Sequence, residues 1–261
     1  MSLLLRLSAG LVLLSSCNRP DFEVSEADRD IKTVNTDNQI FLEGKPLTYS
    51  IKCFNAEGKQ QYVALDGSHG MNYEQNLNFT DEKTGDYVVN TFSISTMANE
   101  EEFMNSSQSP IKFKYFNSAG AMLPETQQTG VVDNAENIWL HPPRSGAFKV
   151  LNLSAYPYVK FPLTLGEKYD YSIVIGKMWA SPEITQWPQN ENTLVFEHRY
   201  IVAEKLKMPY AEDEVECYKI EATTQSDLGK SNSVFYYNEE LGFVKMVFTN
   251  LNGSRFEFDL Q

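Results

Sequence analysis

The stretch from Trp139 to Arg144, Trp-Leu-His-Pro-Pro-Arg, carries the residue types best suited to ligand binding. Trp139, His141 and Arg144 can stack and form hydrogen bonds, as can Tyr156 and Tyr158 further along, and the prolines restrict the backbone. A stiff aromatic surface of this kind suits sugar rings or a partner protein. The alternative, which we favour, is a loop whose aromatic side chains cover an open end of a sheet.

Sequence motifs for covalent, nucleotide-dependent or metal-dependent chemistry are missing. The chain has no Gly-x-Ser-x-Gly elbow, no phosphate-binding glycine-rich loop and no dinucleotide fingerprint. Its histidines, His69, His141 and His198, are scattered without the spacing of metal ligands. The run from Asp66 to Gly70 places a histidine near a carboxylate and a hydroxyl, but two glycines in five residues are typical of a tight turn. We therefore predict no catalytic residue, no metal site and no cofactor.

Acidic residues dominate the charge of the chain, because 35 Asp and Glu face 22 Lys and Arg and give a formal charge of −13. This charge repels phosphate backbones, so we expect no nucleic-acid partner. The acidic runs at 100–102 and 212–214 favour solvated loops, with weak calcium binding as the alternative. Any two of these carboxylates could lie at the spacing of a glycosidase pair. The alternative to a protein that binds without catalysis is therefore an envelope glycoside hydrolase that uses paired carboxylates.

Two cysteines beyond the N-terminal region, Cys53 and Cys217, each lie inside a strand-like run. Outside the inner membrane such a pair can form a disulfide, and two cysteines can pair in only one way. The alternative is two separate buried thiols that behave as small apolar side chains. The sequence leaves both alternatives open, because it does not show whether the two runs are neighbours.

Short strand-like runs alternate with turn signals from residue 40 onwards, and aromatic residues, which favour strands, are abundant. The sequence predicts a mainly β protein of antiparallel sheets, either a curled half-barrel or a sandwich, with little helix. The expected strands are 47–54, 60–65, 73–79, 86–95, 111–116, 193–206, 216–223, 233–237, 243–248 and 255–260.

Turn and proline positions refine this expectation. The run 81–85 predicts a hairpin between the strands on either side of it, and Met208-Pro209 predicts the end of a long strand. Asn252-Gly253 is the clearest hairpin signal, so the last five strands should form an antiparallel meander. Four prolines between residues 139 and 162 predict an irregular loop or edge segments there. One or two helical turns are expected near 98–105.

The residues Leu14-Ser15-Ser16-Cys17 follow a short apolar run, Leu7–Leu14, and resemble the lipobox of bacterial lipoprotein signal peptides. This resemblance implies cleavage before Cys17, a lipid on its thiol and attachment to the membrane. The expected location is the bacterial cell envelope, as an outer-membrane lipoprotein that faces the periplasm or the cell exterior. The polar and acidic residues that follow indicate a solvated tether. The predicted organisation is a signal peptide at 1–16, a lipid attachment and tether at 17–38, and a β-rich domain at 39–261 that could divide near 120–165.

The closing strands supply a second resemblance. The runs Cys217–Ala222, Phe235–Tyr237 and Leu241–Met246 resemble the ends of uncharacterised Bacteroidetes-type lipoproteins and, loosely, the LolA-like half-barrel. That resemblance implies a sheet curled around an apolar groove, but it assigns no ligand-contact residue. Together these patterns predict a lipid-anchored envelope protein that binds an apolar ligand, a glycan or a partner protein without catalysis.

Overall fold

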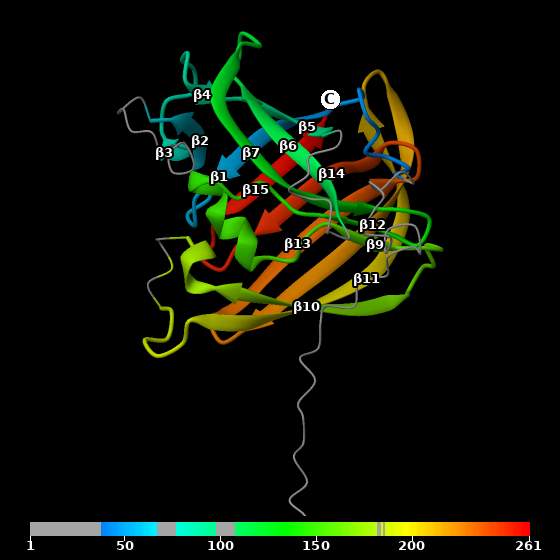
Figure 1. Ribbon diagram of the computed structural model, residues 1–261. Coiled ribbons are helices and arrows are strands. Elements are labelled where there is room, and N and C mark those ends of the chain that lie inside the picture. Colours follow the sequence, from blue (N-terminus) through cyan, green and yellow to red (C-terminus); the bar gives the residue numbers. More distant parts are fainter. Residues whose placement is uncertain (1–37, 67–76, 98–107, 182–183, 185) are drawn as a thin grey trace, which may run out of the picture.

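The computed structural model describes residues 38–66, 77–97, 108–181, 184 and 186–261. These residues form a mainly antiparallel β protein (Figure 1), as predicted. The strands are β1 Leu47–Phe54, β2 Gln60–Leu65, β3 Leu77–Thr80, β4 Val88–Val89, β5 Thr91–Thr96, β6 Ser109–Phe116, β7 Met122–Asp133, β8 Asn137–Leu140, β9 Tyr158–Lys160, β10 Lys168–Gly176, β11 Thr193–Tyr210, β12 Asp213–Ser226, β13 Gly229–Asn238, β14 Gly242–Thr249 and β15 Arg255–Leu260.

The strands build one open sheet whose order is β10-β11-β12-β13-β14-β15-β1-β5-β6-β7-β8-β9, with β2, β3 and β4 as a side branch. The predicted C-terminal meander is confirmed, and β10 extends it by one strand. The sheet curls until its two ends meet through side chains, because the hydroxyl of Tyr169 in β10 donates to the carbonyl of Tyr158 in β9 at 2.8 Å. The described strands therefore form one open sheet that curls back on itself, rather than two separate stacked sheets (Figure 1).

Alternation along the strands explains which face is buried. In β15 the residues Phe256, Phe258 and Leu260 point into the core, while Arg255 and Glu257 point outward. This is the expected pattern for a sheet with one solvated face, because successive side chains point to opposite sides. The same period of two runs through β11, where every second residue from Leu194 to Val202 is buried.

Two predictions about strand ends were wrong. No hairpin joins β3 to β4 or β5, because β3 and β4 each pair with β2 instead. The long strand β11 does not end at Met208-Pro209, since Pro209 lies opposite Glu214 close to the turn that joins β11 to β12. A proline is tolerated there because one missing N–H interrupts little of the ladder near a hairpin end. The irregularity in this strand lies at a bulge between Val202 and Glu204.

The proline-rich stretch is more regular than predicted. It contains β8, the 3-10 helix η3 at Gly146–Leu153, and β9, joined by short irregular pieces. Phe148 of η3 packs against the core, with ring centroids 5.8 Å from Tyr115 in β6 and 5.5 Å from Phe256 in β15. The stretch therefore fills part of the concave side of the sheet. In Figure 1 the green coil of η3 lies close to β15.

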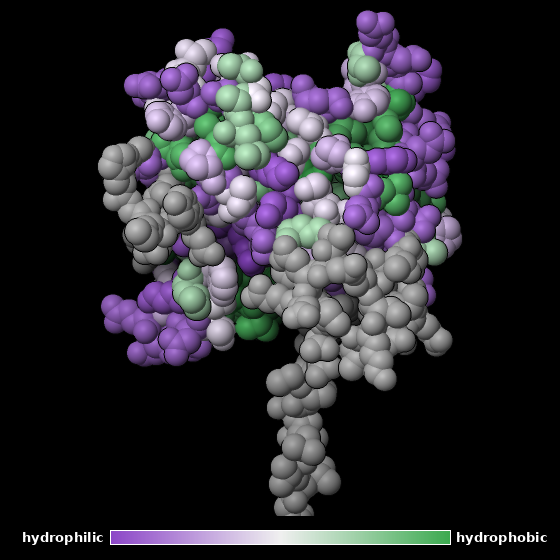
Figure 2. Space-filling view, turned by 45° about the horizontal axis from the view of Figure 1, so that its top comes forward, coloured by the Kyte–Doolittle hydropathy of each residue, from purple (hydrophilic) through white to green (hydrophobic). Residues whose placement is uncertain are grey.

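The surface is mostly hydrophilic on the face shown in Figure 2, with smaller hydrophobic patches between the polar residues. Among the helices of the described residues, none is long and apolar enough to cross a membrane. The predicted signal peptide, Cys17, the tether up to residue 37, His69, the beginning of the expected strand 73–79 and the expected helical turns near residues 98–105 lie outside the described residues.

Candidate ligand-binding site

Three of the predicted binding residues lie in the protein interior. Trp139 is 3% exposed, Tyr156 2% and Tyr158 1%. Trp139 belongs to β8, and its ring lies 5.3 Å from that of Tyr156 and 5.9 Å from that of His141. Backbone pairing of β8 with β7 and β9 holds Trp139 in this position. These three rings are part of the core and do not offer an exposed surface for a ligand.

A buried histidine joins this aromatic cluster from the other end of the sheet. His198 in β11 lies 5.6 Å from Tyr171 and 6.4 Å from Tyr156, measured between ring centroids. Its Nδ1 is 2.9 Å from the hydroxyl of Thr224. Removal from water lowers the pKa of His198 to about 3, since burial disfavours the charged imidazolium. His198 is therefore neutral at physiological pH and acts as a structural ring.

Arg144 reaches the surface at one end of the curled sheet. Its guanidinium lies 4.9 Å from the ring centroid of Trp179, the last residue of the 3-10 helix η4 at Lys177–Trp179. Trp179 is 42% exposed, and its carbonyl accepts a hydrogen bond from the side chain of Asn152. The backbone N–H of Arg144 donates to Gln127, which fixes the chain at this point. Of the predicted residues, Arg144 and the half-buried His141 alone approach solvent.

Cys53 and Cys217 are separate buried thiols, so the structure contains no disulfide between them. Cys53 lies in β1 and Cys217 in β12, with β13, β14 and β15 between these strands in the sheet. Burial raises the pKa of the Cys217 thiol to about 11 and that of the Cys53 thiol further still. Both thiols are therefore protonated, unreactive side chains of the core.

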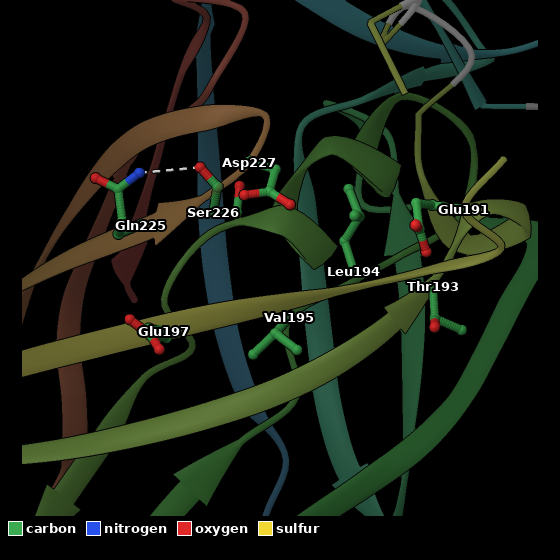
Figure 3. A pocket seen from close by; sticks show the side chains of 8 residues that line it. All are labelled: Glu191, Thr193, Leu194, Val195, Glu197, Gln225, Ser226 and Asp227. Carbon is green, nitrogen blue, oxygen red and sulfur yellow. Dashed lines mark hydrogen bonds between the residues drawn. The ribbon is translucent and has the colours of Figure 1, made fainter. Parts of the chain in front are cut away.

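A surface depression at the beginning of β11 and the end of β12 is the clearest candidate binding site (Figure 3). Its volume is about 430 Å³, within the range of small-molecule sites. Figure 3 shows the side chains of Thr193, Val195 and Glu197 on one side of β11 and that of Leu194 on the other. The depression is lined by Glu191, Thr193, Leu194, Val195, Glu197, Gln225, Ser226 and Asp227.

Sheet register and a small core cluster position these side chains. Glu197 is the cross-strand partner of Gln225, so both lie side by side on the outer face. Gln225 Nε2 donates to the carbonyl of Ser226 at 2.9 Å, which orients the amide. Beneath them Leu194 packs with Trp187, whose indole N–H donates to the carbonyl of Glu191 at 2.8 Å. The lining is therefore supported by packing on its inner side.

The chemistry of the lining is polar with one apolar margin. Three carboxylates, an amide and two hydroxyls offer hydrogen-bond acceptors and donors, and no lysine or arginine is among the lining residues. Val195 is 53% exposed and lies opposite Val174, which is 62% exposed, so the two form an apolar strip on the outer face of β10 and β11. Such a combination can hold a ligand that carries several hydroxyl groups and an apolar face.

No group of histidine, cysteine, aspartate and glutamate suited to a metal ion occurs among the described residues. The acidic run at 212–214 lies at the turn between β11 and β12, where Glu214 Oε2 is 3.6 Å from Lys207 Nζ. The run at 100–102 lies outside the described residues.

The sequence did not predict the depression at β11 and β12. The alternation of Thr193, Val195 and Glu197 predicts their outward direction, but only the register of β11 with β12 brings Gln225 and Asp227 beside them.

No protein-family description and no curated protein sequence matches this chain. Among solved structures, a protein described as exported, with a YmcC-like fold, from Bacteroides fragilis aligns with a TM-score of 0.44 and 12% identity over 86% of this chain and 97% of that one. A protein described as a lipoprotein from Parabacteroides distasonis gives 0.38 and 10%, over 86% and 97% of the two chains. The hypothetical lipoprotein YmcC from Escherichia coli gives 0.34 and 11%, over 86% and 90%. At TM-scores under 0.5 these similarities establish no common function.

Proposed function

We propose that this protein is a lipid-anchored protein of the bacterial cell envelope that binds a glycan without chemical conversion. The lipobox-like residues Leu14-Ser15-Ser16-Cys17 support the anchor, which would carry the domain on the outer membrane. Two or more acyl chains on Cys17 would hold it stably, whereas one chain binds a membrane only marginally.

The observation that carries the binding function is the lining of the depression at β11 and β12. Carboxylates such as Glu197 and Asp227 and the amide of Gln225 can accept and donate hydrogen bonds to sugar hydroxyls. The exposed side chain of Val195 can contact the C–H face of a sugar ring. The mainly polar lining fits a glycan better than the apolar ligand that the LolA-like resemblance implies.

Three carboxylates in one depression also raise the alternative of a glycoside hydrolase. A hydrolase of this type needs one carboxyl group held protonated in a shielded environment, so that it can act as a general acid. Glu191, Glu197 and Asp227 are all exposed, and none has such a shield. The geometry therefore favours binding over hydrolysis.

The proposal is tested with an array of bacterial envelope oligosaccharides and the domain 38–261 carrying a fluorescent label. We expect retention on at least one class of oligosaccharide, and loss of about tenfold or more in affinity for Glu197→Gln and Asp227→Asn, since a hydrogen bond to a charged group contributes ~1.5–3 kcal/mol. Glu239→Gln removes the same charge at the β13–β14 turn and should bind normally. Absence of binding across the array, or equal binding by all variants, would contradict the proposal.

A further inference from the structure

A buried carboxylate fixes the point at which the chain enters the domain. Oδ2 of Asp133, at the end of β7, accepts hydrogen bonds from the backbone N–H groups of Gln39, Ile40 and Phe41 at 3.0, 2.8 and 2.8 Å. Asp133 is fully buried, and charge-assisted hydrogen bonds of this kind are about twice as strong as neutral ones. The first described residues are therefore held to one place on the sheet.

Further contacts define where that place is. The hydroxyl of Ser109 donates to the side chain of Asn38 at 3.0 Å. Ile40 lies directly against Gly242, at the beginning of β14, so closely that a Cβ on this glycine would clash with it. Asn238, at the end of β13, donates to the carbonyl of Glu216 in β12. The chain thus enters beside the β13–β14 turn, and in Figure 1 this blue segment lies next to the outer end of the β11–β12 hairpin.

The depression lies at the opposite end of the same strands. Ser226 ends β12 and Asp227 lies in the connection between β12 and β13, whereas the chain enters at the connection between β13 and β14. Strand β13 runs from one connection to the other as Gly229–Asn238, and ten residues of strand span about 30 Å. The chain therefore enters the domain at the end of the sheet opposite to the depression, with the length of β13 between the two.

We infer that an N-terminal anchor presents the depression away from its own bilayer, toward glycans in the aqueous space or on a facing surface. A sugar headgroup of the anchoring bilayer would have to reach around the whole domain to enter the site. The inference rests on the lipid anchor of the proposed function and is independent of which glycan binds.

Energy transfer on vesicles tests this orientation directly. The chain that begins at Cys17 is coupled through that thiol to a maleimide lipid in phosphatidylcholine vesicles, because Cys53 and Cys217 are buried and unreactive. A donor dye is placed through an azide-bearing amino acid at Glu240, near the chain entrance, or at Lys230, near the depression; both side chains are exposed. Acceptor lipids fill the membrane.

We expect transfer from position 240 to exceed transfer from position 230 by roughly twofold or more, because about 30 Å separates the two ends of β13. Moving the attachment to the other end, with Cys17→Ser and Asn192→Cys, should reverse the order. Equal transfer from both positions, or an order that does not reverse, would overturn the inference. The assay contains no glycan, so failure of the oligosaccharide array would leave its result intact.

Discussion

Replacing Trp139 by alanine distinguishes a structural core ring from an exposed binding surface. The indole is 3% exposed and contacts the rings of Tyr156, His141 and Tyr171. Truncation of a buried aromatic side chain costs ~3–5 kcal/mol, because it removes apolar burial and leaves a cavity. For a domain of this size each kcal/mol lowers the melting temperature by about 2–4 °C, so the expected fall is about 6–20 °C.

The assay is thermal unfolding of the 38–261 domain followed by circular dichroism, with Trp179→Ala as the matched control. Trp179 is 42% exposed, and the guanidinium of Arg144 lies 4.9 Å from the centroid of its ring. A cation–π contact at such a site contributes ~0.5–1 kcal/mol, so the control should lose only about 1–4 °C. Equal small losses in the two variants would refute the placement of Trp139 in the core.

Three further outcomes are expected. His198 has a folded-state pKa of about 3, below the ordinary value of 6.5, so its contribution to stability is complete above pH 6.5 and is lost as the pH falls toward 3. Denaturant melts should therefore show a smaller loss of unfolding free energy between pH 7 and pH 5 for His198→Gln than for the native domain. Phe258→Ala should lower the unfolding free energy by ~3–5 kcal/mol. Glu257→Ala, which removes ion pairs with Lys245 and Arg255 on the opposite face of the strand, should cost clearly less, and similar costs on the two faces would contradict the orientation of β15. Iodoacetamide should label neither Cys53 nor Cys217 in the folded 38–261 domain, and both in the domain unfolded without a reductant, as measured by mass spectrometry. A disulfide between them would leave both cysteines unlabelled in each state.

The C-terminal meander was predictable because its strands combine alternation of apolar and polar residues with turn signals between them. Arg255 to Leu260 is the clearest case, since Asn252-Gly253 precedes it and every second residue is apolar. Local signals failed where pairing is decided by distant residues. The run at 81–85 has hairpin chemistry, yet β3 and β4 both pair with β2, because the register of the sheet decides their partners.

The site was harder to predict than the fold for a related reason. Trp139 and its aromatic neighbours have the composition of a binding surface, but the same composition fills the concave side of a curled sheet, and burial cannot be read from residue type. The depression joins residues about 30 positions apart along a hairpin, Glu197 and Gln225 among them. Exposed polar residues on a strand carry no local mark that separates a binding site from ordinary solvated surface.

Glycan binding without chemical conversion is tested by calorimetric titration of the oligosaccharide that binds most tightly, combined with the mass of that oligosaccharide after incubation. We expect binding at one site by the native domain and an oligosaccharide that is recovered with unchanged mass. The dissociation constant should be about tenfold or more weaker for the double variant Glu197→Gln with Asp227→Asn. Cleavage of the oligosaccharide that is lost in the same double variant would instead make the depression a hydrolase site. Binding that the double variant leaves unchanged would place the ligand elsewhere on the protein.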